Sequence, residues 1–312
     1  MSGGFKRVLR LGTRGSRLAR WQSEFIAEKL KSLVPDLEIE LVEIKTHGDR
    51  DRNSPLSAIG GMGLFTKEIQ RALLDGVVDL AVHSLKDLPT RGPEGLVLAA
   101  VPAREVAFDG LIAPTYRTLA ALPPGSRLGT SSQRRRAQVL HLRPDLNVVE
   151  LRGNVETRLA AATEGRLEAV ILAEAGLNRL SLSHHVTETL GPPRFLPAVG
   201  QGALGIECRA DDLETRQRLA RLDHAETHRA VLAERRVLFD LEGGCTIPLA
   251  AWARVVGALL HIDAAVFDLD GREKVAISVE GDPSDPEGLG DRAAIRLRQL
   301  GAAEVLERTR RS

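Results

Sequence analysis

The sequence predicts an α/β protein with two similar doubly wound lobes, followed by a small α+β domain. Two observations predict the lobes: a repeated four-residue segment, and a matching succession of helices and strands after each copy. A third, a run of short strand patterns near the C-terminus, predicts the extra domain. A chain of 312 residues is long enough for two or three domains with separate cores.

Arg10-Leu11-Gly12-Thr13 recurs as Arg127-Leu128-Gly129-Thr130, and each copy ends an extended run that leads into a helical pattern. After the first copy we expect helix 16–33, strand 37–45, helix 64–74 and strand 77–83. After the second copy we expect the same succession, as helix 131–143, strand 146–152, helix 155–164 and strand 167–173. Strands that alternate with helices indicate parallel βαβ units. Two such lobes usually hold a ligand between them, at the carboxyl ends of their strands.

The C-terminal part follows another pattern. A long helix over His224–Leu241 leads to Gly243-Gly244-Cys245, and short strand patterns follow, with Asp270-Gly271 as a hairpin turn. A final helix is expected to begin near Asp291. Residues 46–63 show no periodicity and are rich in glycine and charge, so we expect a lid there, with simple disorder as the alternative.

Composition narrows the function classes. The chain is 43% apolar and 27% charged, as is usual for a globular protein. It has no apolar run of the ~20 residues that a membrane helix needs, and its start lacks the apolar segment of a signal peptide. Two cysteines favour a reducing compartment, so a cytoplasmic location is expected. A net charge of +1 and 3% aromatic residues argue against a nucleic-acid binder.

Arginine-bearing turns are the first candidate sites. Only seven cations are lysines, and several arginines stand where a strand meets a helix, at Thr13-Arg14-Gly15-Ser16, Thr130-Ser131-Ser132 with Arg134-Arg135-Arg136, and Arg152-Gly153-Asn154 with Arg158. Helix N-termini accept anions. Cations in a first helical turn oppose the helix dipole, so they are expected to be unfavourable until an anion binds. The alternative is ordinary N-capping by Thr and Ser with incidental arginines.

The segment Val77–Thr90 is the second candidate. It is apolar through Val82 and then polar at His83, Ser84, Lys86 and Asp87. Polar residues at the carboxyl end of a buried strand stand where α/β proteins do chemistry. Adjacent strand residues point to opposite faces, which predicts different roles for Lys86 and Asp87. A turn with a solvated Lys-Asp pair is the competing interpretation.

The two cysteines differ in setting. Cys208 lies in an alternating strand pattern and is expected to be a structural core residue. Cys245 follows two glycines that can end a helix, so its sulfur is a candidate nucleophile or attachment point. The eight histidines form no metal pattern, and no metal is expected.

Seven segments, in unbroken order over residues 11–248, closely resemble the porphobilinogen deaminase (hydroxymethylbilane synthase) family: LGTRGSRLARWQ, GLFTKE, AVHSLKDLPT, GTSSQRRR, LRGNVETRL, LPAVGQGALGIE and LEGGCTIP. The resemblance implies lobes similar to type II periplasmic binding proteins. It also implies that the chain crosses back between them. The expected domains are 1–102 with 197–220, then 103–196, and finally 221–312.

In this family, the cysteine that matches Cys245 holds a dipyrromethane cofactor through a thioether. The enzyme adds four porphobilinogens to this primer, with loss of ammonia, and hydrolysis releases hydroxymethylbilane in tetrapyrrole biosynthesis. Each pyrrole carries an acetate and a propionate, and burying unpaired carboxylates is costly. The resemblance therefore implies carboxylate binders, which by position are Arg14, Arg134, Arg135, Arg152 and Arg158, assisted by Ser16, Lys86, Thr130, Ser132 and Arg179.

Asp87 matches the family's catalytic aspartate. Loss of ammonia leaves a cationic methylene-pyrrole, and a carboxylate that accepts the pyrrole N–H stabilises that charge as it develops. It also serves for proton transfer during ammonia loss and final deprotonation. The protein is expected to act on a small molecule as a monomer, without nucleic acid or membrane.

The sequence departs from the family at two places. Met62, in the expected lid with Gly61 and Phe65, stands where many members carry lysine, and residues 103–110 are unusual near the crossing between lobes. A non-enzymatic, two-lobed anion-binding protein is the alternative from another class. In such a protein, Asp87 and Cys245 would have no role.

Overall fold

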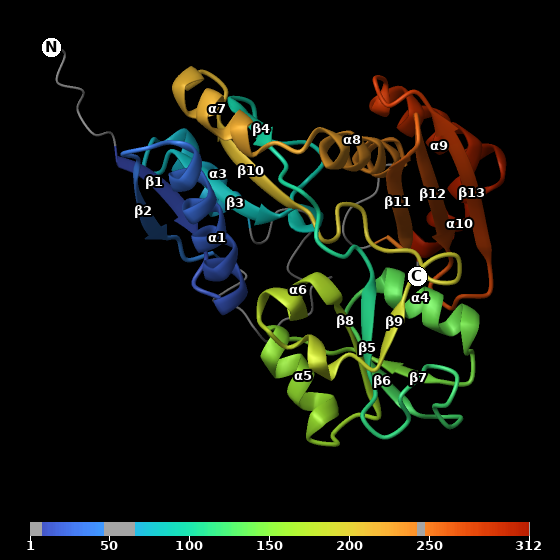
Figure 1. Ribbon diagram of the computed structural model, residues 1–312. Helices are drawn as coiled ribbons and strands as arrows, with labels where there is room; N and C mark the ends of the chain where they lie inside the picture. The colour runs from blue at the N-terminus through green and yellow to red at the C-terminus, as the bar shows by residue number, and fades with distance from the viewer. Residues whose placement is uncertain (1–7, 47–65, 242–246, 312) are drawn as a thin grey trace, which may run out of the picture. The chain divides into compact units, whose positions relative to one another are not determined.

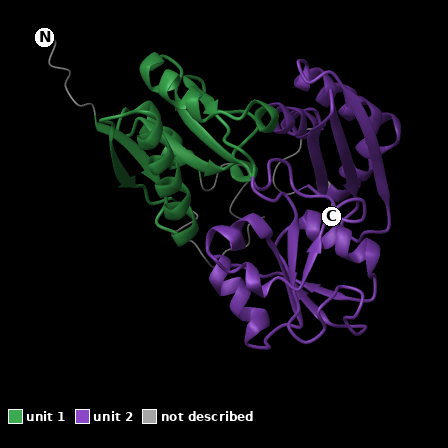
Figure 2. Cartoon of the chain, in the orientation of Figure 1, with its two compact units in different colours: residues 1–104, 203–228 green, residues 105–202, 229–312 purple. Residues whose placement is uncertain are grey.

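The structure is a computed structural model that describes residues 8–46, 66–241 and 247–311 (Figure 1). The chain divides into two compact units (Figure 2). Unit 1 contains residues 1–104 and 203–228, and unit 2 contains residues 105–202 and 229–312. The second lobe and the C-terminal domain thus belong to one unit. The expected Cys245 tether and the expected lid residues Gly61, Met62 and Phe65 lie outside the described residues.

The sheet of unit 1 has five strands, in the order β2 (Glu38–Glu43), β1 (Val8–Thr13), β3 (Leu80–Ser84), β10 (Leu204–Arg209) and β4 (Leu96–Ala100). β1 pairs in parallel with β2 and β3, as the βαβ pattern predicts. β10 runs antiparallel to both β3 and β4. The chain therefore returns from unit 2 to insert β10 into a sheet that began almost two hundred residues earlier.

Helices cover both faces of this sheet. α1 (Arg17–Leu33) packs with α7 (Leu213–Leu219) and the short helix η3 (Ala220–Leu222) on the face lined by Leu80 and Val82. α3 (Lys67–Leu74) covers the opposite face, where Ala81 points. The period-two alternation of β3 thus gives each face its own apolar core. Cys208 is fully buried in the α1 core, as expected for a structural thiol.

The lobe of unit 2 repeats this plan. Its strand order is β7 (Asn147–Val149), β6 (Arg127–Gly129), β8 (Ala169–Ala173), β5 (Asp109–Ile112) and β9 (Glu188–Leu190). β6 pairs in parallel with β7 and β8, and β5 runs antiparallel to β8 and β9. The repeated glycines have the same register: Gly12 pairs with Ala81, and Gly129 pairs with Val170. The predicted duplication is therefore present in the fold.

Helices of this second lobe also divide between two faces. α4 (Gln133–Leu142) packs on one face of the sheet, with Val139 against Leu128 and Ile171. α5 (Val155–Thr163) and α6 (Glu174–Arg179) cover the other face. A short helix, η2 (Ser183–His185), precedes β9. Helices on both faces of the sheet, α4 on one and α5 with α6 on the other, are the doubly wound arrangement that the sequence predicts.

The C-terminal domain contains an antiparallel sheet of β11 (Leu249–Val256), β12 (Leu259–Phe267) and β13 (Lys274–Gly281). One face packs against α8 (Ala225–Asp240), α9 (Pro286–Gln299) and α10 (Ala302–Arg311). From the other face, Ala265 and Phe267 contact Ala137 of α4. α4 therefore lies between the sheet of the second lobe and the C-terminal sheet.

Three details differ from the prediction. Each lobe sheet contains an antiparallel strand beside its βαβ units. The final part of the chain forms two helices, and α9 begins at Pro286, after the N-cap Asp285, rather than near Asp291. Asp270-Gly271 belongs to a longer connection between β12 and β13. Gly271 has a φ of +70° there, and a Cβ would lie 2.4 Å from the backbone nitrogen of His141, so close approach to α4 requires glycine.

Candidate active site

The predicted site residues of unit 1 lie in two turns at one edge of its sheet. Arg14 and Ser16 stand between β1 and α1, whereas Lys86 and Asp87 are the last two residues of the short helix η1 (Leu85–Asp87). Because β1 and β3 are adjacent parallel strands, both turns follow the same carboxyl edge. Lys86 and Asp87 are half-buried, and they lie in a helical turn rather than on the strand that the sequence predicts.

Hydrogen bonds hold these two turns. Ser16 is the N-cap of α1, and its hydroxyl accepts a hydrogen bond from the backbone N–H of Ala19 at 3.3 Å. The side-chain amide of Gln22 on α1 donates to the hydroxyl of Ser84 at the end of β3, at 2.9 Å. Gln22 is buried and links α1 to the end of β3, yet nothing in its local pattern distinguishes it from other helix residues.

A buried polar cluster supports the end of β3. Nε2 of His83 lies 3.1 Å from a carboxylate oxygen of Glu207 on β10, an ion-pair distance without hydrogen-bond geometry. Gln70 on α3 donates to both oxygens of the same carboxylate at 3.1 Å. All three side chains are buried. Since an unpartnered buried carboxylate is very costly, the cluster fixes the strand end that leads to Asp87.

In unit 2, Thr130 and Ser132 form the turn between β6 and α4. The hydroxyl of Thr130 accepts from the backbone N–H of Ser132 at 3.2 Å. Ser132 is the N-cap of α4 and accepts from the backbone N–H of Arg135 at 3.4 Å. Ser132 therefore caps α4, and capping leaves the first-turn arginines to be explained separately.

Arg134 and Arg135 share one carboxylate. Arg134 Nη2 donates to Asp109 Oδ2 at 2.7 Å, and Arg135 donates to Asp109 Oδ1 from Nε at 2.9 Å and from Nη2 at 2.7 Å. The guanidinium groups also donate to backbone carbonyls, Arg134 to Leu196 at 2.6 Å and Arg135 to Ile171 at 3.0 Å. Asp109 is 0% exposed and both arginine side chains are at most 6% exposed. Strand β5 thus supplies an internal anion to the α4 N-terminus.

This carboxylate corrects one expectation. The sequence predicts that the first-turn cations of this helix stay uncompensated until a ligand arrives, but Asp109 already neutralises part of their charge. The two guanidinium groups carry two positive charges, and the single carboxylate of Asp109 balances only one of them. Burial lowers the pKa of Arg134, Asp109 opposes that effect, and the nearby Arg135 adds to it. Arg134 Nε is buried without a hydrogen-bond partner among the residues that the structure describes. The cluster keeps an excess of positive charge.

The remaining predicted arginines lie in other turns of unit 2. Arg152 is half-buried after β7, and Arg158 donates from Nε to the Gly153 carbonyl at 2.8 Å. Gly153 has a φ of +113°, so this turn favours glycine. Arg179, at the end of α6, donates to the Gly202 carbonyl at 2.7 Å. Burial lowers the pKa of Arg179 to about 10, partly offset by Glu105.

Two absences concern the described residues alone. Within 8–46, 66–241 and 247–311, no three His, Cys, Asp or Glu side chains are grouped closely enough to hold a metal ion. Over the same ranges, no helix is both long and apolar enough to span a bilayer.

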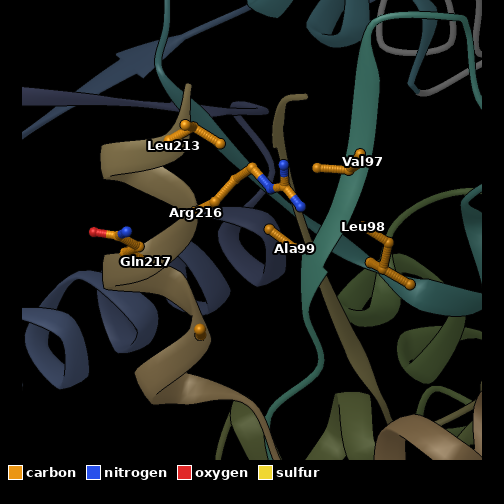
Figure 3. Close-up of a pocket in the computed structure, with 7 residues that line it drawn as sticks. Val97, Leu98, Ala99, Leu213, Arg216 and Gln217 are labelled. Atoms are coloured by element: carbon orange, nitrogen blue, oxygen red, sulfur yellow. The ribbon is translucent and has the colours of Figure 1, made fainter. Parts of the chain in front are cut away.

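A surface pocket of about 360 Å³ lies in unit 1 between β4 and α7 (Figure 3). Its lining is mainly apolar, with Arg216 and Gln217 from the helix and Val97, Leu98 and Ala99 from the strand. None of the predicted site residues lines this pocket, so it plays no part in the candidate active site.

Comparisons with known proteins cover nearly the whole chain. A family model described as "Porphobilinogen deaminase, dipyromethane cofactor binding domain" matches residues 9–217. A second, "Porphobilinogen deaminase, C-terminal domain", matches residues 228–299. The porphobilinogen deaminase of Maridesulfovibrio salexigens is 46% identical over 302 residues, which are 97% of this chain and 98% of the relative. That of Chloroherpeton thalassium is 48% identical over 305 residues, covering 96% and 97%.

Similar solved structures include periplasmic binding proteins. The periplasmic aliphatic sulphonate binding protein SsuA from Escherichia coli matches with a TM-score of 0.39 and 16% sequence identity. The match covers 77% of this chain and 71% of that protein.

Proposed function

Because the chain belongs to the porphobilinogen deaminase family, we propose that it is a hydroxymethylbilane synthase, a transferase of tetrapyrrole biosynthesis. It joins porphobilinogen units head to tail, with loss of ammonia, on a covalently held dipyrromethane, and releases hydroxymethylbilane by hydrolysis. The observation that carries this proposal is the full-length match: family models and relatives cover both lobes and the C-terminal domain. A non-enzymatic anion-binding protein is no longer a competing proposal.

The described residues suit a dipyrromethane cofactor because this group is rich in carboxylates. Arg134 has a buried Nε without a partner among the described residues, and the Arg134–Arg135–Asp109 cluster retains positive charge. Arg179 is buried enough that its pKa falls. Each charge-assisted hydrogen bond to a carboxylate would contribute about 1.5–3 kcal/mol. In unit 2 these arginines, with Arg152 and Arg158, bind the acetate and propionate groups of the pyrrole chain.

Thr130 and Ser132 have a supporting role at the same turn. Their side chains are committed to backbone N–H groups, so they hold the start of α4 in the conformation that presents Arg134 and Arg135. In unit 1, Ser16 holds the start of α1 in the same way. Arg14 and Lys86, from the two turns of that unit, bind further carboxylates.

Asp87 is proposed as the catalytic group. When bound, the cofactor supplies the free pyrrole carbon on which the chain grows. The Asp87 carboxylate accepts a hydrogen bond from the pyrrole N–H of the incoming porphobilinogen. It thereby stabilises the positive charge that develops on the pyrrole as ammonia leaves. The same carboxylate takes part in the proton transfers that follow. A backbone hydrogen bond of 3.1 Å from Leu88 to Leu85 closes the turn that carries Asp87, which limits the movement of the carboxylate.

Cys245 is proposed as the attachment point of the cofactor, and Gly61, Met62 and Phe65 as part of a lid. We also propose that the protein acts as a monomer in the cytoplasm. The low cysteine content supports a reducing compartment. A substrate that is a free small molecule gives no reason for a nucleic-acid or membrane partner.

Intact-protein mass spectrometry of the purified chain tests the proposal. The expected spectrum shows a covalent addition of one dipyrromethane, and brief incubation with porphobilinogen adds further pyrrole units in steps. Purified protein that forms hydroxymethylbilane while its mass equals that of the bare chain would overturn the covalent-primer proposal. Absence of any product from porphobilinogen would overturn the activity itself.

A further inference from the structure

Asp109 has no binding or catalytic role of its own in the function proposed above, yet it contacts two of the proposed binding residues. Its side chain is fully buried at the first position of β5, and it accepts three hydrogen bonds from Arg134 and Arg135 at 2.7–2.9 Å. A carboxylate with this geometry restrains both guanidinium groups, because Oδ2 accepts from Arg134 while Oδ1 accepts from two donors of Arg135.

Asp109 is itself held by Gln201. The Gln201 side-chain amide donates to Asp109 Oδ1 at 3.0 Å and to the Ala107 carbonyl at 2.7 Å. Gln201 is fully buried and lies between two glycines of positive φ, Gly200 and Gly202. A Cβ at Gly202 would lie 2.4 Å from the Glu105 carbonyl oxygen, so glycine allows this turn to approach the strand that Asp109 begins. The carboxylate therefore has a fixed support from a distant segment.

The helix that carries the arginines is also fixed. α4 packs with Val139 against the second-lobe sheet and with Ala137 against Phe267 of the C-terminal sheet. Nδ1 of His141, near its end, lies 2.9 Å from the Gly271 carbonyl oxygen. Because the backbone of α4 is held from two sides, the remaining freedom of Arg134 and Arg135 is in their long side chains, which Asp109 restrains.

Charge explains why a restraint is needed. Two guanidinium groups repel each other at close range, and both lie in the first turn of a helix, where the dipole opposes cations. Without a shared anion they would separate or turn toward water. We propose that Asp109 is a positioning residue, which holds Arg134 and Arg135 together in the orientation that binds carboxylates of the pyrrole chain, with Gln201 fixing Asp109. This inference rests on the proposed function, in which the two arginines bind those carboxylates.

The chain supplies a matched control in the other lobe. Asp79 is also buried, and its Oδ1 accepts from two arginines, Arg10 at 3.0 Å and Arg209 at 3.2 Å. Neither arginine belongs to the proposed site. Replacing Asp79 or Asp109 by Asn removes one buried charge that two guanidinium groups share. Both variants are expected to lose stability, whereas only Asp109→Asn is expected to lose ligand binding.

The experiment compares Asp109→Asn, Asp79→Asn and the parent protein, each a full chain purified without separating loaded from unloaded protein. Three quantities are measured: the fraction of chains with the covalent addition, by intact mass; the KM and kcat of the loaded fraction; and the melting temperature. Both variants are expected to melt below the parent. Only Asp109→Asn is expected to load less primer and to show a KM for porphobilinogen raised about 10-fold, as misplacement of one charge-assisted hydrogen bond predicts.

Equal loading and equal KM in Asp109→Asn and Asp79→Asn would overturn the proposal and leave Asp109 a stabilising residue only. If Asp109→Asn does not fold, Gln201→Met provides the second variant, since it keeps the charge of Asp109 and removes one hydrogen bond to it. Its KM is expected to rise about 3-fold, and a parental KM would overturn the proposal. A parent protein without covalent addition would instead overturn the proposed function, and this inference with it.

Discussion

Arg10 holds Asp79 with three hydrogen bonds across adjacent parallel strands. Its backbone N–H and Nε donate to Asp79 Oδ2 at 2.9 and 3.2 Å, and its Nη2 donates to Oδ1 at 3.0 Å. Asp79 is the residue immediately before β3. The same relationship recurs in the second lobe, where Arg127 donates from N and Nε to Glu168 Oε2 at 2.6 and 3.3 Å, and from Nη2 to Oε1 at 3.1 Å.

The repeated Arg-Leu-Gly-Thr segment thus begins with an arginine that clamps the start of the neighbouring strand. Glu168 occupies the position before β8 that Asp79 occupies before β3. The two clamps differ in burial, because the side chain of Asp79 is 4% exposed and that of Glu168 is 30% exposed. This difference leads to the first prediction.

Asp79→Asn is expected to lower the free energy of unfolding by about 1–3 kcal/mol, because a buried neutral amide replaces the carboxylate that Arg10 and Arg209 share. Glu168→Gln is expected to cost less than about 1 kcal/mol, since its ion pair is open to solvent. Urea unfolding of both variants measures the difference. Equal losses would mean that burial does not set the strength of these clamps.

The stability that Asp79 contributes should depend on pH. Burial raises the pKa of Asp79, but the hydrogen bonds from Arg10 and Arg209 outweigh it and hold the pKa below its usual 3.8. A carboxyl whose pKa is lowered by folding stabilises the folded state at pH values above its pKa in the unfolded chain. This contribution is lost as the pH falls through its pKa in the folded protein. The stability difference between the parent and Asp79→Asn is therefore expected to be constant from pH 6 to 8 and to shrink below about pH 4. Urea midpoints at several pH values check this trend.

Glu174→Gln is expected to stabilise the protein at neutral pH. Burial raises the pKa of Glu174, a hydrogen bond from Thr189 opposes this, and Asp109 and Glu105 raise it further. A carboxyl with a raised pKa stabilises the folded state when protonated, and that stability is lost as pH rises through its folded pKa. Glutamine keeps an acceptor for Thr189 without the charge. The melting temperature at pH 7.5 should rise by roughly 1–3 °C, with a smaller gain at pH 4.

Asp87→Asn is expected to fold, to retain the covalent cofactor and to lose at least about 100-fold in kcat. The side chain is half-buried in a surface turn, so an isosteric amide disturbs little, whereas a neutral group cannot balance the charge that develops on the substrate. Stopped assays of product formation on protein of verified mass measure the effect. A parental kcat would remove Asp87 from catalysis.

Cys245→Ser is expected to yield a chain of unmodified mass that forms no hydroxymethylbilane, because the proposed thioether cannot form. Cys208→Ser is the control, since Cys208 is buried in the unit 1 core and burial raises its pKa to about 11, which disfavours the reactive thiolate. The control should keep the covalent addition. Normal product formation by Cys245→Ser would place the attachment elsewhere.

Much of the fold follows from the sequence because strong periodicity and the repeat are local signals. The helices α1, α4, α5 and α8 begin within a few residues of their predicted starts, since capping residues such as Ser16 and Ser132 precede clear helical patterns. The short strands β4, β5 and β9 are not predicted, because three to five residues carry little periodic information. The antiparallel direction of β5 and β10 depends on distant pairing that no local pattern encodes.

In the candidate site too, sequence motifs predict some features, whereas contacts between distant residues determine others. Family motifs identify the arginines and Asp87, but they do not indicate that Asp109 neutralises part of the charge on Arg134 and Arg135. That contact joins Asp109 of β5 to residues of α4 that lie 25 and 26 positions later in the chain, so neither the helix pattern nor its capping residues predict it. Gln201 and Gln22 are missed for the same reason. These two glutamines differ from others in the chain only in the hydrogen-bond partners that the folded structure places next to their side-chain amides.

The position of β10 has a consequence for synthesis on the ribosome. β10 lies between β3 and β4, so β4 gains its partner only when the chain beyond the whole second lobe has emerged. A nascent chain that ends before Leu204 carries a first lobe with an unfilled gap and exposed main-chain donors and acceptors. Chaperone binding to stalled chains should therefore persist through translation of the second lobe and fall once residues 204–209 leave the exit tunnel.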